Sequence, residues 1–153
     1  MNGVMRIESF LRQSPIYQTS RAARRMESSV NTLLEHEGLT LSESLMLAAI
    51  FLEKKRVRPS ELAATFETTR GNVSHAISSL EAKRLVRRRI DPDDARGFLL
   101  ELEPAGRRRA ARVAGILDRM QAAFEREIGQ TRLESTLRQL NSIEQLCGRL
   151  TQG

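Results

Sequence analysis

A run of short polar side chains with helical spacing carries most of the chemistry that this sequence offers. Its hydroxyl, amide, imidazole and guanidinium groups are those that hydrogen-bond phosphates and base edges. They belong to Thr69, Arg70, Gly71, Asn72, Ser74, His75 and Ser78. At the start of a helix, Thr69 and Arg70 suit phosphate contacts because the free N–H groups there attract anions. Asn72 can bond an adenine edge through two atoms, and Gly71 suits a close backbone approach. The alternative is a helix face that is merely solvated.

A second group of candidate residues is rich in arginine. Arg87, Arg88 and Arg89 crowd a strand-like segment, and Arg96 follows in a turn beside Asp94. An arginine at a hairpin tip suits a narrow, electronegative minor groove. We expect the Asp94 carboxylate to orient the Arg96 guanidinium through a charge-assisted hydrogen bond. The alternative is an exposed turn with an incidental ion pair, which would contribute little.

The elements that must position these residues follow one another without gaps. Helical spacing of apolar residues predicts helices over 59–66 and 70–84, the second with Thr69 as its N-cap and with Val73, Ile77 and Leu80 facing inward. Strand patterns over 85–90 and 98–102 flank a turn over 91–97. This order predicts a mainly α fold with a small β-hairpin wing, that is, a winged helix-turn-helix.

Longer helices are predicted on both sides of this unit. A helix over 5–36 should break or kink near Pro15 and end before Gly38. A capping box from Thr40 to Glu43 should open a helix through about Lys55. We expect its buried face to comprise Leu41, Leu45, Ala48, Ala49 and Leu52. A helix from Pro104 and another over 131–150 should meet near Gly129.

Two segments, SELAATFETTRGNVSHAISSLEAKRLV and DPDDARGFLLELEPAG, resemble the MarR family of bacterial transcriptional regulators. Asp94-Ala95-Arg96 matches the family's Asp-any-Arg wing motif. The resemblance implies one domain over 1–153, with a DNA-binding lobe over 40–103 and dimerisation helices over 1–38 and 104–153. It also implies a repressor that binds a pseudo-palindromic double-stranded DNA operator as a homodimer. A cytoplasmic location is expected from the sequence itself, which has neither an apolar run long enough to span a membrane nor a signal-peptide core. Two features depart from the family pattern. Glu67 stands where glycine is usual, and Phe98 and Glu101 stand where basic residues are common.

The resemblance further implies that the terminal helices of two chains interlock. The residues that would do so are Ile7, Phe10, Leu133, Leu137, Leu140, Ile143, Leu146 and Leu150. The stripe near the C-terminus is too apolar to leave exposed on a monomer. The alternative is packing within one chain.

Regulation by a small aromatic or phenolic effector is also implied by the family, with Tyr17, Met46 and Ile50 as candidate pocket residues. Each of these could equally be ordinary core. Cys147 offers a second route, as a redox-sensing thiol, although a buried and inert cysteine is the simpler interpretation. Glu35, His36 and Glu37 are adjacent in sequence and therefore point in different directions, so we expect no metal site there.

Composition narrows the functional classes. The net charge is +6, with 25 basic against 19 acidic side chains, which favours a polyanionic partner. One cysteine and two histidines exclude an intrachain disulfide and make a zinc cluster improbable. We find no catalytic or phosphate-binding motif and expect neither an enzyme nor a cofactor. No apolar run is long enough to span a membrane. A winged-helix protein-interaction module remains the alternative, but such a module should have lost positive charge from the wing.

Overall fold

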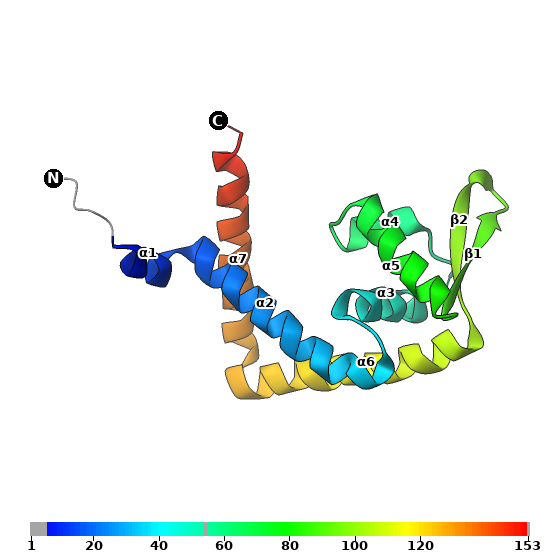
Figure 1. The fold of residues 1–153 in the computed structure, drawn as a ribbon, viewed down its shortest axis with the longest axis horizontal. Helices are drawn as coiled ribbons and strands as arrows, with labels where there is room; N and C mark the ends of the chain where they lie inside the picture. Colours follow the sequence, from blue (N-terminus) through cyan, green and yellow to red (C-terminus); the bar gives the residue numbers. More distant parts are fainter. Residues whose placement is uncertain (1–5, 54, 153) are drawn as a thin grey trace. The chain divides into compact units, whose positions relative to one another are not determined.

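The computed structural model describes residues 6–53 and 55–152, which form two compact units. The first, here called the winged unit, is Ser29–Leu117. The second, here called the helical unit, combines the residues before 29 with those after 117. Helices α2 (Pro15–Leu34) and α6 (Pro104–Ile128) contribute residues to both units. Figure 1 shows the order of the elements along the chain.

The winged unit begins with a short 3-10 helix, η1 (Glu35–Glu37), which ends at Gly38 in a left-handed conformation (φ 66°). Helix α3 (Leu41–Leu52) follows, and its predicted capping box is confirmed. The Thr40 hydroxyl accepts a hydrogen bond from the Glu43 amide at 3.2 Å, and the Glu43 carboxylate accepts one from the Thr40 amide at 3.0 Å. The helix ends three residues earlier than the predicted end at Lys55.

The predicted buried face of α3 was largely wrong. Its buried apolar residues are Met46, Leu47, Ala48 and Ile50, whereas Leu52 is 68% exposed. The helix is apolar on nearly all sides and packs against both α5 and β2. Periodicity identifies a buried face only where a polar face opposes it, so the sequence of α3 could not show which side turns inward.

Helices α4 (Pro59–Thr65) and α5 (Arg70–Ala82) pack on one another and confirm the predicted helix-turn-helix. Thr69 caps α5, because its hydroxyl accepts a hydrogen bond from the Asn72 amide at 3.1 Å. The turn between the helices holds Glu67 at φ 48°. A side chain with a Cβ atom is strained in this left-handed region, as expected for a glutamate at a position where glycine is usual.

The wing is an antiparallel hairpin of β1 (Val86–Asp91) and β2 (Asp94–Leu102). The predicted seven-residue turn was wrong, because Asp91 pairs with Asp94 and only Pro92 and Asp93 form the turn. Ile90 pairs with Phe98, so Ala95, Arg96 and Gly97 form a bulge in β2. The Leu100 amide also donates to the Val57 carbonyl at 2.8 Å, which ties the wing to the segment before α4.

The wing meets α6 at a very close backbone approach. A Cβ atom added at Gly106 would lie 1.8 Å from the Leu85 carbonyl oxygen. The same oxygen accepts a hydrogen bond from the Glu103 amide at 2.9 Å. The start of α6 is therefore held against the base of the wing, and this position requires glycine. The apolar core of the unit lies between α3, α5, the wing and α6, around Leu47, Val73, Ile77, Leu80 and Val113.

The helical unit contains α1 (Ile7–Gln13), α7 (Gln130–Leu150) and parts of α2 and α6. The predicted break at Pro15 is confirmed, with Ser14 between the two N-terminal helices. Gly129, at φ 92°, separates α6 from α7. No described residue of α1 or α7 is buried. Among the helices described, none is both long and apolar enough to cross a membrane.

Candidate nucleic-acid interface

A groove of about 730 Å³ lies between α5, the start of α4 and the wing. It brings together half of the residues proposed from sequence as DNA-binding: Arg70, Ser74, Ser78, Arg88, Asp94 and Arg96. It also contains residues that the sequence analysis missed, namely Arg58, Pro59, Ser60, Ile77, Gly97 and Phe98. Residues from both the helix pair and the wing thus line one surface.

The groove is strongly cationic. Arg58, Arg70, Arg88 and Arg96 line it, against one lining carboxylate, Asp94. Arg70 and Arg96 are exposed, and neither forms a salt bridge with any residue that the structure describes. An open surface lined by charge of one sign attracts ions of the other sign, so this groove is suited to an extended polyanion.

Arg58 joins α4 to the wing. Its Nε and Nη2 atoms both lie 2.7 Å from Oδ2 of Asp91, which is only 2% exposed. The hydrogen bonds that the Asp91 carboxylate accepts from the Asp93 amide and from Arg58 lower the pKa of Asp91, and the same carboxylate raises the pKa of Arg58. The sequence signal for this pair was weak, because Asp91 stands in an ordinary turn sequence, Asp-Pro-Asp-Asp.

Arg88 joins the wing to α5. Its guanidinium forms an ion pair with Glu81 and also donates to the Ser78 hydroxyl at 3.2 Å. The Arg88 amide donates to the Glu81 carboxylate at 3.1 Å. Part of the charge of Arg88 is therefore compensated within the protein. The contacts indicate that this side chain holds the wing beside α5.

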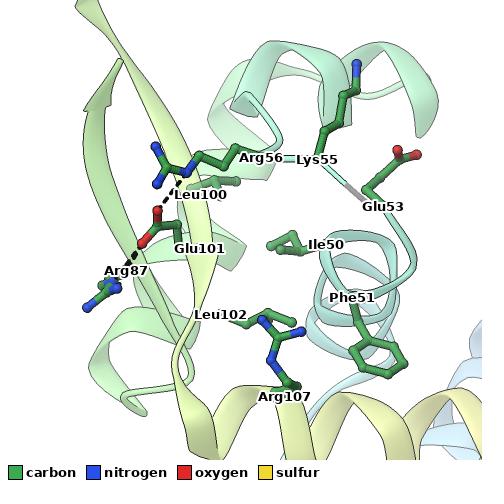
Figure 2. Close-up of a pocket in the computed structure, with 10 residues that line it drawn as sticks. All are labelled: Ile50, Phe51, Glu53, Lys55, Arg56, Arg87, Leu100, Glu101, Leu102 and Arg107. Carbon is green, nitrogen blue, oxygen red and sulfur yellow. Dashed lines mark hydrogen bonds and ion pairs between the residues drawn. The ribbon is translucent and has the colours of Figure 1, made fainter. Parts of the chain in front are cut away.

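Arg87 and Arg89 lie on the other face of the hairpin, because side chains alternate along a strand. Both contact Oε2 of Glu101, at 2.9 and 2.7 Å, and Arg56 contacts Oε1 of the same carboxylate at 2.9 Å (Figure 2 shows Arg56 and Arg87). The hydrogen bond from Arg89, opposed by partial burial and followed by that from Arg87, lowers the pKa of Glu101. The sequence placed these arginines in one group with Arg96, and the structure separates them.

The predicted hydrogen bond between the side chains of Asp94 and Arg96 was wrong. The Asp94 carboxylate accepts a hydrogen bond from the backbone amide of Arg96 at 3.0 Å, and no ion pair joins the two side chains within the described chain. Asp94 therefore fixes the bulge in the backbone and leaves the Arg96 guanidinium unpaired. The sequence did not predict the bulge and therefore could not predict this backbone hydrogen bond.

The N-terminal half of α5 presents the remaining candidates to solvent. Gly71, Asn72 and His75 are exposed, and the Asn72 amide group donates to the Thr68 hydroxyl at 3.0 Å. A Cβ atom at Gly71 would meet only the Thr69 hydroxyl, at 3.7 Å, which is an ordinary contact. Nothing in the fold therefore requires glycine at this position, unlike at Gly106.

A buried carboxylate fixes α5 against α3. Glu43 accepts hydrogen bonds from Ser79 and from Nζ of Lys83, the latter at 2.7 Å, and Lys83 also donates to the Gly38 carbonyl at 2.9 Å. Burial raises the pKa of Glu43, but the hydrogen bonds from Lys83, Ser79 and Thr40 outweigh it, so the pKa lies below its ordinary value. The capping box identified Glu43 from sequence, whereas its partners 36 and 40 residues away could not be predicted.

The other predicted sites are distributed over both units. Met46 and Ile50 belong to the core of the winged unit, and Tyr17 is a partly exposed residue of the helical unit. Cys147 is a partly buried free thiol on α7. Within the described residues no group of three metal-ligating side chains was found, and Glu37 is instead paired with Arg112 at 3.0 Å.

Comparison with known proteins agrees with this geometry. Residues 37–97 match the family model described as MarR family. The fold is similar to that of MepR from S. aureus in complex with DNA, at 19% identity and a TM-score of 0.76 over 86% of this chain and 96% of that one. It is also similar to the transcriptional regulator MOSR from M. tuberculosis in complex with DNA, at 26% identity and a TM-score of 0.72 over 88% and 98%.

The transcriptional regulator SlyA is a third similar structure, at 14% identity and a TM-score of 0.71 over 90% of this chain and 96% of that one. No curated protein matches significantly by sequence. The family match covers the helix pair and most of the wing, and the fold similarity extends over almost nine-tenths of the chain. Residues 37–97 therefore match the MarR family, and the fold over most of the chain is similar to that of solved transcriptional regulators.

Proposed function

We propose that this protein binds double-stranded DNA in a sequence-specific manner, with α5 in the major groove and the wing on its flank. The observation that carries the proposal is the cationic groove, in which unpaired arginines from α5 and from the bulge of β2 line one surface. This is the docking geometry of helix-turn-helix proteins, whose second helix contacts bases while neighbouring elements contact the backbone. Two of the similar structures, MepR and MOSR, are described as DNA complexes.

The side chains divide between two tasks in this proposal. Arg70 and Arg96 contact phosphates or the minor groove, because they are exposed and unpaired. Asn72, Ser74, His75 and Ser78 face the bases, with Thr69 and Gly71 close to the phosphate backbone. Arg88 holds the wing in place. Of the other proposed contacts, Arg87 and Arg89 are secondary, because both are already paired with Glu101, which partly compensates their charge.

The exposed apolar surface of the helical unit supports a homodimer. Large apolar side chains on its four helices are at least one-third exposed, among them Ile7, Phe10, Phe124, Leu137, Leu140, Leu146 and Leu150. Such a surface is typical of a protein interface, and a second copy of the chain fits it because symmetric dimers bind symmetric sites. In this proposal residues 40–103 supply the DNA-binding lobe, and residues 1–38 and 104–153 supply the dimerisation helices. Leu133 and Ile143 complete the interface.

The dimer can be tested on α7 with a matched pair of variants. Leu137, 63% exposed, should become incompatible with an apolar interface when replaced by glutamate. Gln139→Glu introduces the same side chain two residues away on the same helix. Sedimentation should show a dimer for wild type and Gln139→Glu and a monomer for Leu137→Glu. A monomeric wild-type protein would contradict the proposal.

The DNA-binding proposal is tested by fluorescence anisotropy at several salt concentrations. The probe is the DNA upstream of the protein's own gene, compared with a scrambled duplex. A specific regulator should bind the first at least about a thousandfold more tightly than the second. If the two bind equally, selection from random duplexes identifies another operator, and failure to enrich any sequence contradicts specific binding. Release of the DNA by an aromatic or phenolic compound would support a ligand-responsive repressor.

A further inference from the structure

The wing carries a pair of exposed apolar side chains that belong neither to the core nor to the ion pairs of the hairpin. Ile90 and Phe98 are cross-strand partners, at 69% and 48% exposure. Cross-strand partners project from the same face of a hairpin. Elsewhere in the wing, Val86 and Leu100 are almost completely buried. Burial of apolar surface is favourable, so an exposed pair near the tip indicates a surface that contacts another molecule.

Phe98 lies in the groove proposed for DNA. It lines the same surface as Arg70 and Arg96, and along the chain it is separated from Arg96 only by Gly97. The apolar pair is therefore continuous with the cationic surface. A partner that fits both must offer negative charge and apolar surface side by side. Double-stranded DNA does so, because its minor groove exposes sugars and base edges between two rows of phosphates.

The pair also has a simpler role within the hairpin, which a test must separate from binding. Contacts between aromatic and β-branched cross-strand partners stabilise antiparallel strands. That role affects the free energy of unfolding of the protein, and it gives no dependence on the sequence of a bound duplex. A dependence of binding on the DNA sequence beside the wing therefore distinguishes a DNA contact from a purely structural pair.

We propose that Phe98, supported by Ile90, is an apolar wedge that enters the minor groove beside Arg96 and partly unstacks one base step there. Apolar side chains that enter the minor groove kink DNA in this way, and pyrimidine–purine steps such as TA kink most readily. The wedge makes the base step at the flank of the site part of the recognised operator, although no hydrogen bond reads it. This inference rests on the DNA-binding function proposed above and assigns part of its specificity to an uncharged side chain.

The test starts from a duplex that the full-length wild-type protein selects from random DNA. A TA step is then moved along the flank of that duplex, within an otherwise stiff A-tract. Wild type should bind at least about fivefold more tightly when the TA step occupies one particular position in the flank. When 2-aminopurine replaces the adenine of that step, its fluorescence should rise on binding, because unstacking relieves its quenching by neighbouring bases.

Three variants locate the effect. Phe98→Thr should abolish both the TA preference and the rise in fluorescence, while threonine still favours a strand and preserves the hairpin. Phe98→Leu should retain most of both, because leucine is also an apolar wedge. Leu52→Thr, at a position 68% exposed at the end of α3, removes another apolar side chain of the winged unit and should change neither. The salt slope should be the same for all these proteins, because none of the substitutions changes a charge.

The outcomes separate this inference from the proposed function. A TA preference that survives Phe98→Thr overturns the wedge and leaves specific DNA binding intact, as does the absence of any flank preference in wild type. Lower stability of Phe98→Thr with an unchanged preference assigns the pair to the hairpin alone. If wild type without DNA sediments as a larger species than Phe98→Thr, the pair is a protein contact and the wedge is wrong. Failure of wild type to select any duplex overturns both proposals.

Discussion

The groove side and the outer face of the wing both carry arginines, but their electrostatic surroundings differ. On the groove side Arg96 is unpaired and lies in the same groove as Arg70. On the outer face Arg87 and Arg89 share the carboxylate of Glu101. The wing therefore carries one arginine that is free to bind a polyanion, Arg96, and two whose charge a shared carboxylate partly compensates, Arg87 and Arg89.

The difference has a structural origin in the hairpin. Alternation along β1 places Arg88 opposite to its two neighbours, and the bulge in β2 carries Arg96 out of the regular register. Position 101 holds a glutamate and not a basic residue, so the arginines of the outer face have an acidic partner within the wing. This glutamate lowers the net positive charge of the outer face, and the unpaired arginine of the wing, Arg96, lies on the groove side.

The largest effect is expected at Gly106, where the start of α6 supports the base of the wing and therefore both of its faces. Gly106→Ala would force a Cβ atom to within 1.8 Å of the Leu85 carbonyl, and backbone atoms cannot yield as a flexible side chain would. We expect a loss of at least about 3 kcal/mol in the free energy of unfolding. Chemical denaturation measures it, and Gly148→Ala, with no atom within 4 Å of the added Cβ, is the control. A comparably small effect of both variants would mean that α6 does not anchor the wing in this way.

The next effect concerns the helix that borders the groove. Asn72→Ala should weaken binding to the specific site by about 1–3 kcal/mol if Asn72 reads a base. Binding to scrambled DNA should change much less, because phosphate contacts carry no sequence information. Competition anisotropy with both duplexes provides the comparison. An equal loss on both would make Asn72 a residue that positions the helix on the backbone.

The two faces of the wing are compared directly by Arg96→Ala and Arg89→Ala. Each removes one positive charge from the hairpin. We expect Arg96→Ala to weaken binding to all duplexes about tenfold and to reduce the salt slope by about one unit, as for loss of one phosphate contact. Arg89→Ala should have a smaller effect, because Arg89 is paired with Glu101, which partly compensates its charge. Equal losses would show that total charge matters and that its placement does not.

The sequence was sufficient for the helix pair and the hairpin, and it identified half of the residues that line the groove. Apolar spacing defined α4 and α5, Thr69 was identified as a cap, and the wing was recognised from its strands and turn residues. These features depend on residues within a few positions of one another, where propensity and hydrogen-bonding rules apply directly.

What the sequence did not reveal depends on long-range contacts. The ion pair of Arg58 with Asp91 and the hydrogen bonds of Glu43 with Ser79 and Lys83 join residues that are 33 to 40 positions apart. The bulge that frees Arg96 depends on the register of two strands, which a single missing or extra residue changes. The division of the arginines between the two faces follows from that register and not from their order in the chain.

The smallest effect is expected from the titration of the outer face. The guanidinium of Arg89, with those of Arg87 and Arg56, lowers the pKa of Glu101, so this carboxylate gains stability on folding in its ionised form. A lowered folded-state pKa contributes stability that is present above the ordinary value of 4.5 and is lost as the pH falls through the folded-state value. The free energy of unfolding of wild type should therefore exceed that of Glu101→Gln by a constant amount near neutral pH, less than about 1 kcal/mol at this surface site.

That difference should shrink when denaturation is repeated at acidic pH, and a difference that stays constant would contradict the role of Glu101. Glu53→Gln is the control, because Glu53 is exposed and forms no salt bridge within the described residues. Glutamine, like the protonated carboxyl, is neutral, so Glu101→Gln removes the negative partner of Arg87 and Arg89. This variant should therefore bind scrambled DNA slightly more tightly than wild type, because the outer face then also carries unpaired arginines, as the groove side does.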